Sequence, residues 1–345
     1  MKAAVLERPG ELVIKDREMA VCGDDEILVK VKACNICKTD LKCFSMGQRD
    51  LIYPRVLGHE IAGTIVQKGN RAMGYHVGQR VHVHPGIICG KCDYCTDKKD
   101  NLCDHVQIMG FNYDGGFQEY LRIPAEGVKG RILNVISNED LNFEEISFIE
   151  PLACCVNIQD SLEMNPSSVM VIIGGGRMGA LNLLLAKASG IKRVLLIEEN
   201  EKRCKSGRKL GFDQVFSGKT EDIIEQIKAA TGGMGADVVI PCCPGPGALD
   251  LALKILRKNG QLGYFSGVIN EADVRPDINL IHYKEISVKG SYGCSCAHSR
   301  KAKALLECGK IDVKPLISHR VRLDELALGM KFVKNSDGYS TIVKF

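Results

Sequence analysis

The chain has 345 residues, of which 45% are apolar and 26% charged, the balance of a soluble globular protein with material for a large core. This composition excludes a disordered, collagen-like or coiled-coil chain. The 46 basic and 42 acidic residues give a net charge of +4, too small an excess to favour binding to nucleic acid or to a membrane surface. At about 150 residues per domain, the length predicts two domains.

The N-terminal residues lack the apolar segment of a secretory signal. The longest apolar stretch, near Val169–Gly176, is far shorter than the roughly 18 residues of a membrane span. We therefore expect a soluble, cytoplasmic protein. In such a protein the sixteen cysteines favour metal binding or catalysis over disulfides.

The first stretch, up to about Leu152, is rich in β-branched residues punctuated by glycine and proline. No long helical period interrupts it before Ile149, so we expect a mostly-β domain over residues 1–151. The predicted strands are Glu26–Ala33, Ala62–Gly69, Gly78–Pro85 and Phe117–Pro124.

The middle stretch, residues 152–291, alternates short apolar runs with helical patterns. This alternation predicts an α/β domain with a doubly wound parallel sheet. The predicted strands are Ser168–Ile173, Val194–Glu198, Gln214–Phe216, Ala236–Ile240 and Gln261–Phe265. The predicted helices are Met178–Ala188, a charged segment ending near Leu210, Glu221–Ala230 and Ala248–Arg257.

The last stretch, residues 292–345, has helical patterns at Ser299–Cys308 and Leu323–Val333 and a final short strand at residues 341–345. The chain shows no internal repeat, low-complexity segment or flexible linker.

Four cysteines in a lobe at about residues 86–105 have the spacing C-x2-C-x2-C-x7-C. Four thiolates with turn-forming residues between them can close a tetrahedron around Zn²⁺ and leave no open position, which is typical of a structural site. An iron–sulfur cluster also takes four thiolates, but its usual runs are spaced differently. The expected ligands are Cys89, Cys92, Cys95 and Cys103. Three flanking histidines are left without a ligand role: His82, His84 and His105.

Three short segments together offer a thiolate, an imidazole and carboxylates: CNICKTD at Cys34–Asp40, GHE at Gly58–Glu60, and Glu150 before Pro151. Each alone is weak, because a single cysteine or histidine is most often a packed core residue. Together they predict the mixed ligand set of a catalytic zinc, which keeps an open position.

The sequence GGGRMG follows the apolar strand at Ser168–Ile173 and opens a helical pattern. A glycine-rich turn in this context lets a helix N-terminus approach a pyrophosphate. Glu198 ends the next strand and can accept hydrogen bonds from ribose hydroxyls, and its charge favours NAD(H) over NADP(H). A tight turn without ligand is the alternative. The expected cofactor residues are Gly174, Gly176, Arg177, Met178, Gly179, Glu198 and, on the following helix, Arg203.

In this order, the motifs resemble the zinc-containing medium-chain dehydrogenase/reductase family over essentially the whole chain. The segment EPLAC and the glutamate at position 150 are similar to its sorbitol and threonine dehydrogenase branch. The resemblance implies a GroES-like β domain that carries both zinc ions and a Rossmann domain that binds NAD(H). It also implies that the segment 292–345 returns to the first domain.

The resemblance also assigns roles to single residues. Cys37 matches the thiolate ligand of the catalytic zinc and His59 the imidazole ligand. Glu60 matches a carboxylate that ligates or approaches the metal, and Glu150 the third or water-bridged ligand. Thr39 matches the hydroxyl that passes on the substrate proton.

One departure from the family concerns Lys42, which stands where many members have a relay histidine. A lysine is not suited to titrate near neutrality, so either the proton leaves through water and the ribose or Lys42 is perturbed. Lys42 as a plain surface residue is the third possibility. Arg49 and Arg55 could meet an anionic substrate or be ordinary surface charges.

The predicted activity is reversible hydride transfer between a small-molecule secondary alcohol and NAD⁺. The predicted cofactors are two Zn²⁺ per chain and NAD(H), and the family suggests a homodimer or homotetramer. A zinc-free quinone or enoyl reductase would lack Cys37, His59 and the cysteine lobe. A zinc-binding scaffold or nucleic-acid protein would leave the glycine turn and Glu198 unexplained.

Overall fold

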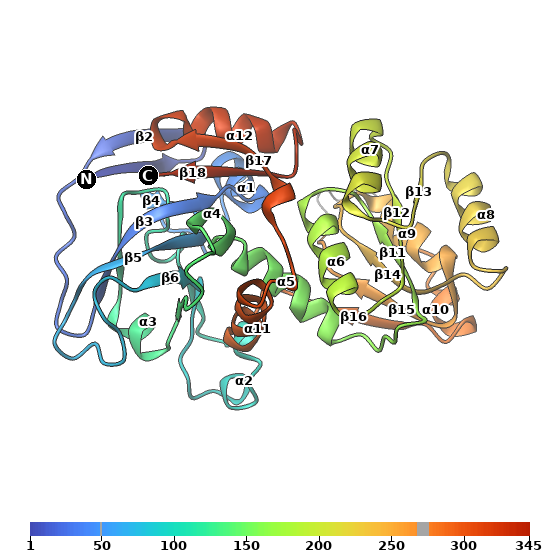
Figure 1. Ribbon diagram of the computed structural model, residues 1–345, viewed down its shortest axis with the longest axis horizontal. Coiled ribbons are helices and arrows are strands. Elements are labelled where there is room, and N and C mark those ends of the chain that lie inside the picture. Colours follow the sequence, from blue (N-terminus) through green and yellow to red (C-terminus); the bar gives the residue numbers. More distant parts are fainter. Residues whose placement is uncertain (49, 268–275) are drawn as a thin grey trace. The chain divides into compact units, whose positions relative to one another are not determined.

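The computed structural model describes residues 1–48, 50–267 and 276–345. Contacts within it divide the chain into two compact units (Figure 1). Unit 1 comprises Met1–Ala153 and Gly293–Phe345, and unit 2 comprises Cys154–Tyr292. Helix α5 (Ile149–Asp160) begins in unit 1 and ends in unit 2. Among the described residues, no helix is long and apolar enough to cross a membrane.

Unit 1 is built mainly from β-strands. Its strands are β1 (Lys2–Arg8), β2 (Glu11–Asp16), β3 (Ile27–Asn35), β4 (Arg55–Val56), β5 (Glu60–Lys68), β6 (Arg80–Val83), β7 (Gly86–Ile87), β8 (Gln107–Ile108), β9 (Tyr120–Ile123), β10 (Leu133–Val135), β17 (Ile317–Arg322) and β18 (Ser340–Lys344). Its helical segments are α1 (Lys38–Met46), α2 (Asp93–Thr96), η1 (Asp100–Leu102), α3 (Ala125–Lys129), α4 (Phe143–Ile146), α11 (Cys296–Glu307), η2 (Lys314–Leu316), η3 (Leu323–Glu325) and α12 (Leu326–Lys334).

The main sheet of unit 1 joins distant parts of the chain. Its order is β10-β6-β5-β3-β18-β17, with β9 also paired to β3. Strands β3 and β5 are antiparallel, and Asn35 lies opposite Glu60. Strand β18 pairs antiparallel with the end of β3, so residues 340–344 complete the sheet that the first stretch begins.

The prediction for the first stretch was incomplete. All four predicted strands are present, and the nine-residue helix α1 lies between the first and the second of them. The sequence analysis expected no long helical period here and did not name this short helix. The helix is short and largely polar, so it has little apolar period to detect. It begins directly after Cys37, the N-cap residue, and it carries Thr39.

Unit 2 alternates strands and helices. After α5 it contains β11 (Val169–Ile173), α6 (Arg177–Ala188), β12 (Arg193–Ile197), α7 (Glu201–Leu210), β13 (Gln214–Phe216), α8 (Thr220–Ala230), β14 (Ala236–Pro241), α9 (Pro246–Ile255), β15 (Leu256–Tyr264), α10 (Asn279–Tyr283) and β16 (Ser287–Gly290).

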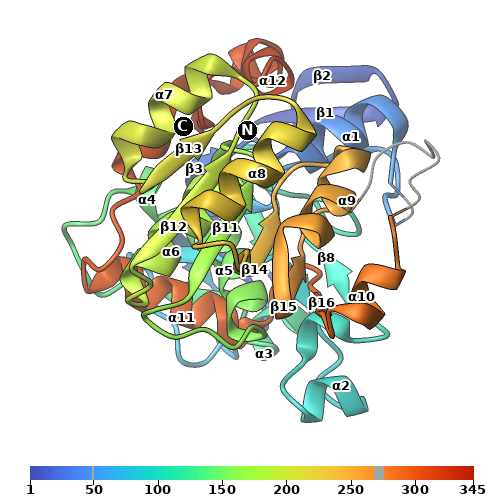
Figure 2. The same cartoon turned by 90° about the vertical axis from the view of Figure 1, so that its right-hand side faces the viewer.

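Six strands in the described part of unit 2 form one parallel sheet in the order β13-β12-β11-β14-β15-β16 (Figure 2). This is the Rossmann strand order, and its reversal point lies between β11 and β14. Side chains alternate between the two faces of β11: Val171 packs with α8 and α9, and Ile172 packs with α6. Both faces are therefore covered, as the apolar runs of the sequence predicted.

One boundary in unit 2 was predicted wrongly. The helical pattern was expected to continue to Arg257, but α9 ends at Ile255 and β15 begins at Leu256. The left-handed backbone of Asn259 (φ 55°) and the glycine after it mark an irregular start of this strand, where its register against β14 shifts.

Candidate functional site

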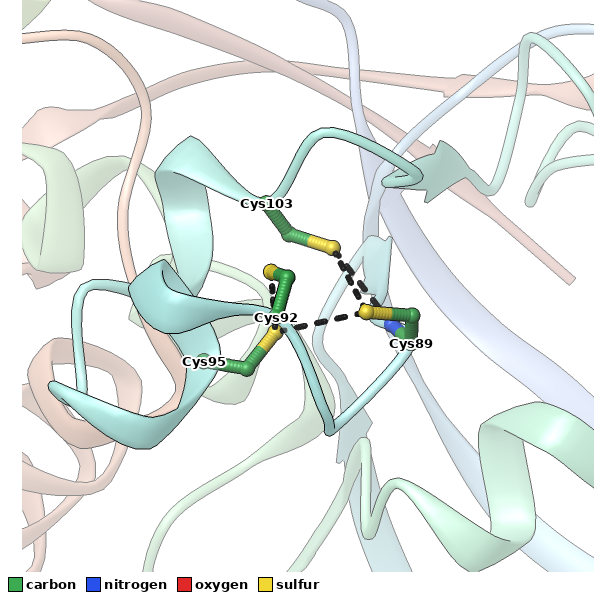
Figure 3. Close-up of side chains that lie close together, drawn as sticks. All are labelled: Cys89, Cys92, Cys95 and Cys103. Carbon is green, nitrogen blue, oxygen red and sulfur yellow. Dashed lines mark hydrogen bonds between the residues drawn. The ribbon is translucent and has the colours of Figure 1, made fainter.

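Four cysteine side chains converge in the lobe that β7 and β8 close at its base (Figure 3). Cys89 follows β7, Cys92 is the N-cap of α2, Cys95 lies within α2, and Cys103 follows η1. The four sulfur atoms lie within 4.8 Å of one another. Four residues from one short segment therefore form a single donor set.

The distances between these sulfur atoms fit a tetrahedral zinc site. They are 3.5 Å for Cys92–Cys95, 3.6 Å for Cys89–Cys103 and 3.9 Å for Cys89–Cys95. With zinc–sulfur bonds of about 2.3 Å, a regular tetrahedron has edges of about 3.8 Å. The lobe thus has the donors and the size that a structural Zn²⁺ requires.

The thiols of the lobe have different acidities. Backbone N–H groups of Lys91 and Cys92 lower the pKa of the Cys89 thiol to about 6. Burial and hydrogen bonds from neighbouring thiols raise the pKa of Cys95 to about 12. The Cys89 thiolate therefore forms more readily than that of Cys95, and a bound divalent cation would favour the thiolate form of both.

A second donor set comprises the side chains of Cys37, His59 and Glu60, whose ligand atoms also lie within 4.8 Å of one another. Cys37 caps α1, Glu60 is the first residue of β5, and His59 precedes it. His59 and Glu60 are buried. A thiolate, an imidazole and a carboxylate are all donors that Zn²⁺ accepts, and three protein donors leave room for a fourth ligand.

The chain reaches this site through a constrained glycine. Gly58 has φ +92°, and a Cβ atom there would come within 2.9 Å of the Cys34 sulfur and 3.0 Å of the Phe117 ring. Only glycine adopts this conformation without strain and without displacing those side chains. The GHE segment therefore places His59 and Glu60 by backbone geometry as well as by β5.

Asp40 is a site residue that the sequence analysis missed. Its fully buried carboxylate accepts hydrogen bonds from the backbone N–H of Cys37 (2.8 Å) and of Gly58 (3.2 Å). One oxygen also lies 3.5 Å from Nδ1 of His59. Asp40 thus links the two segments that carry the donors. The signal for it was an acidic residue three positions after the N-cap Cys37, where it can satisfy the N-cap N–H.

Asp40 also raises the pKa of His59. Burial lowers the pKa of this imidazole, but the Asp40 carboxylate and the Cys37 sulfur raise it more, so that it lies well above its ordinary value. A carboxylate beside a histidine nitrogen is the usual support for a metal-ligating imidazole. It leaves Nε2 as the nitrogen that can face a metal.

Helix α1 also carries the two residues that the sequence analysis considered for proton transfer, Thr39 and Lys42. The Thr39 hydroxyl is 3.6 Å from the Cys37 sulfur. Lys42 is exposed on the same helix. The structure therefore brings Thr39, but not Lys42, into hydrogen-bond contact with the described donor set.

Glu150 lies in the first turn of α5 and is buried. Its carboxylate is not among the ligand atoms that converge with Cys37, His59 and Glu60, and it lies instead within 4.8 Å of the Cys294 sulfur. The metal-ligand role of Glu150 stays a prediction.

The glycine-rich turn lies between β11 and α6, at the strand reversal point of unit 2. Gly174 has φ +102°, and a Cβ atom on Gly179 would come within 2.0 Å of the Gly174 carbonyl oxygen. Gly176 is the N-cap of α6, and Arg177 and Met178 form its half-buried first turn. The turn therefore leaves a helix N-terminus open to an anionic group.

Glu198 follows β12 and faces this turn. Its buried carboxylate accepts hydrogen bonds from the backbone N–H of Gly175 (2.7 Å) and of Asn200 (2.8 Å). The Arg203 guanidinium lies 3.9 Å from the same carboxylate. The structure thus brings Glu198 and Arg203 together beside the glycine turn, and each Glu198 oxygen keeps capacity for another hydrogen bond.

Of the two arginines considered for an anionic substrate, Arg55 is already paired. Its guanidinium lies 3.2 Å from the Asp114 carboxylate, which Arg17 also contacts at 2.8 Å. Arg49 lies outside the described residues. The donor set of Cys37, His59 and Glu60 is called the Cys37 group below. Next to it, the Phe111 ring packs edge-on against His59, with 6.0 Å between the ring centroids.

Two families match the chain. The alcohol dehydrogenase GroES-like domain matches residues 23–130, and the zinc-binding dehydrogenase family matches residues 178–309. L-threonine 3-dehydrogenase of Caldanaerobacter subterraneus subsp. tengcongensis is 31% identical and covers 94% of this chain and 93% of its own length. Sorbitol dehydrogenase of Bacillus subtilis (strain 168) is 29% identical, covering 94% and 91%.

Solved structures of other proteins also resemble this chain over its whole length. A protein of Sinorhizobium meliloti 1021, solved with NADP bound, matches with a TM-score of 0.91 and 28% identity over 100% of this chain and 99% of its own. 2R,3R-butanediol dehydrogenase of Bacillus subtilis matches with a TM-score of 0.89 and 25% identity over 100% and 99%. The chain belongs to the zinc-containing medium-chain dehydrogenase family, in its sorbitol and threonine dehydrogenase-like branch.

Proposed function

We propose that this dehydrogenase transfers a hydride reversibly between a secondary alcohol and NAD⁺. The observation that carries the proposal is the presence of two chemically different donor sets. The four-cysteine lobe offers a closed set, whereas Cys37, His59 and Glu60 offer three mixed donors. A closed set stabilises structure, and three protein donors leave a position for substrate.

The residues of the second set fit a catalytic Zn²⁺. Cys37, His59 and Glu60 would hold it, with Glu150 as a further or water-bridged ligand. Bound there, the metal supplies Lewis-acid stabilisation of a developing negative charge on the substrate oxygen. Asp40 holds the Cys37 backbone and supports His59, and the Thr39 hydroxyl takes the substrate proton onward. Because Lys42 is exposed, we route that proton through Thr39 and the cofactor ribose or water.

The cofactor residues support NAD(H). The helix N-terminus at Gly176 suits a pyrophosphate, and Glu198 suits the two ribose hydroxyls. A 2′-phosphate there would meet the Glu198 carboxylate, a like charge that Arg203 at 3.9 Å only partly offsets. The Sinorhizobium relative was solved with NADP, so we propose a preference for NAD(H) and not an exclusion of NADP(H).

The substrate class is supported by the named relatives, which include dehydrogenases of sorbitol, L-threonine and L-galactonate. We propose a polyol, amino alcohol, sugar-derived or cyclic secondary alcohol, oxidised to the ketone, with an aldehyde formed where a primary alcohol is accepted. The pairing of Arg55 with Asp114 argues against Arg55 as a binding group for an anionic substrate.

The test is a panel of these alcohols with NAD⁺ and with NADP⁺, read at the NADH absorbance. We expect at least one alcohol to be oxidised, with kcat/KM for NAD⁺ about 100-fold above that for NADP⁺. Glu198→Ala should narrow this ratio mainly by weakening NAD⁺ binding. No oxidation of any alcohol by protein that holds two zinc ions would contradict the proposed activity, and equal kcat/KM values would contradict the role of Glu198.

We further propose a cytoplasmic homodimer or homotetramer. All sixteen cysteines lie among the described residues and none forms a disulfide, which suits a reducing compartment. Strand β16 is the edge of the unit 2 sheet, and all its residues are exposed. A parallel sheet with such an open edge can pair with a second copy. Light scattering at micromolar concentration should show an oligomer, and a monomer would contradict the proposal.

A further inference from the structure

Two contacts flank the N-cap residue of α11, and one of them comes from the cysteine lobe. Ser295 is the N-cap of α11. On one side of it, the Cys294 sulfur lies 3.9 Å from Nδ1 of His84. On the other side, the backbone N–H of Cys296 donates to the Asp100 carboxylate at 3.0 Å. His84 precedes the lobe in the chain, and Asp100 lies inside it, in η1 just before Cys103.

All of these groups are buried. Asp100, His84, Cys294 and Cys296 are each at most 8% exposed. The Asp100 carboxylate faces the N-terminal end of a twelve-residue helix, where a negative charge is favourable. Burial and this carboxylate raise the pKa of the Cys296 thiol to about 12, so this thiol stays protonated beside Asp100.

Other contacts of α11 come from outside the lobe. The Asn134 amide donates to the Ser299 hydroxyl at 2.8 Å and lies 3.2 Å from Nδ1 of His82. These residues belong to β10, α11 and β6. The Asp100 carboxylate thus links the lobe itself to the start of α11.

Cys294 connects this link to the predicted catalytic site. Its sulfur lies within 4.8 Å of the Glu150 carboxylate, and both side chains are buried. A shift of the first turn of α11 would therefore move a group that packs beside Glu150, because buried side chains have little free space in which to absorb a displacement.

We propose that Asp100 is a positioning residue for Glu150. It fixes the start of α11, and through Cys294 it fixes the surroundings of the Glu150 carboxylate. The cysteine lobe then contributes to the geometry at the Cys37 metal site as well as to stability. This inference rests on the proposed function, in which Glu150 acts at that metal.

The test uses the holoenzyme with zinc kept in the lobe and Co²⁺ exchanged into the Cys37 site. The visible absorption of Co²⁺ reports on its ligands and their geometry. Glu150→Gln should change this spectrum, and Asp100→Ala should change it in the same direction. Asp100→Asn should change it less, since its amide oxygen can still accept from the Cys296 N–H. Asp104→Ala is the matched control, because Asp104 is an exposed acid of the same lobe, and it should give the wild-type spectrum.

A second readout needs no metal at the Cys37 site. Loss of a hydrogen bond to a charged group should raise the alkylation rate of Cys294, followed by peptide mass spectrometry, about tenfold in Asp100→Ala. A wild-type cobalt spectrum in Asp100→Ala, with a changed one in Glu150→Gln, overturns the proposal. So does an unchanged spectrum in Glu150→Gln, whatever the alcohol panel shows.

If Asp100→Ala cannot be purified with zinc in the lobe, the cobalt spectrum of Cys294→Ala is the deciding test, because this variant leaves Asp100 and the lobe intact. A changed spectrum in that variant supports the proposal, and a wild-type spectrum overturns it. Failure of the proposed function would appear differently, as no oxidation of any alcohol by protein with normal metal content.

Discussion

The cysteine lobe and the Cys37 group offer similar donor atoms, but they are assembled differently. In the lobe, all donors come from residues 89–103 and are placed by turns within that segment, and three of the four cysteines are partly exposed. In the Cys37 group, α1 and β5 must be brought together, and His59 and Glu60 are buried. The lobe therefore depends on its metal for shape, whereas the Cys37 group is shaped by the fold around it.

The largest effect should come from the Cys37 group and should appear in activity. Cys37→Ser removes one of three donors and should lower kcat/KM about 1000-fold or more. Its free energy of unfolding should stay within about 1 kcal/mol of wild type, because the surrounding sheet does not depend on the metal. Cys308→Ser, at an exposed cysteine, is the control for both measurements. A loss in activity below tenfold would show that Cys37 holds no catalytic metal.

The converse variant is Cys92→Ser in the lobe. It should reduce the zinc content from two ions to one and lower the free energy of unfolding by about 4 kcal/mol, because metal binding is folding free energy in a segment without its own core. Elemental analysis and urea denaturation measure the two quantities. Equal stability losses in Cys92→Ser and Cys37→Ser would remove the distinction between the two sites.

His84, which lies beside Cys294, should affect the pH dependence of stability. Burial, together with the Arg300 and His298 charges, lowers the pKa of His84 from 6.5 to about 4. The unfolded chain therefore binds a proton more readily than the folded one. The stability that neutral His84 contributes is fully present above pH 6.5. As the pH falls from 6.5 towards 4, the free energy of unfolding decreases by about 3 kcal/mol.

The measurement is the free energy of unfolding against pH for wild type and His84→Gln. The wild-type value should fall more steeply than that of the variant between pH 6.5 and 4. His76→Gln, at an exposed histidine, should follow the wild type. Parallel curves for wild type and His84→Gln would show that His84 is not buried in its neutral form.

The smallest effect should come from Asp40, which touches the donors without being one. Asp40→Asn keeps an oxygen acceptor but loses the charge, and it should weaken metal binding at the Cys37 site about 10- to 100-fold. Competition with a chelator measures this affinity. Asp93→Asn, at an exposed acid in the lobe, should leave both metal affinities unchanged. An Asp40→Asn variant with wild-type affinity would contradict the supporting role of Asp40.

The two sites also differ in how far the sequence could predict them. The lobe follows from spacing alone, since its donors are close in the chain and any fold that closes the segment brings them together. For the Cys37 group, the residue types suggested a mixed zinc site, but the roles of the single residues needed the resemblance to a family, because no pattern in one sequence shows that Cys37 and His59 meet. The glycine-rich turn was easier to predict than the Cys37 group but harder than the lobe. Its strand, glycines and helix are contiguous in the chain, and only Glu198 comes from the next strand.

What the sequence analysis missed depends on contacts between distant residues. The segment CNICKTD does not by itself indicate a role for Asp40. The role arises because Gly58 and His59 lie next to its carboxylate in the fold. The same holds for His84 and Asp100, whose partners lie about 200 positions later in the chain. Helix α1 was missed for a local reason, since nine largely polar residues show too little periodicity.

The pairing of β18 with β3 has a consequence for the order in which the protein folds during synthesis. The Ser340 hydroxyl donates to the Asn35 side chain across 305 positions, and the Glu144 carboxylate binds Arg320 and Lys344. Unit 2 can close its sheet once residue 292 has left the ribosome. In unit 1, the Ala33–Asn35 end of β3 keeps one edge unpaired until residues 340–344 emerge. An exposed strand edge on a nascent chain invites mispairing, so this unit is the part of the protein for which chaperones would matter most.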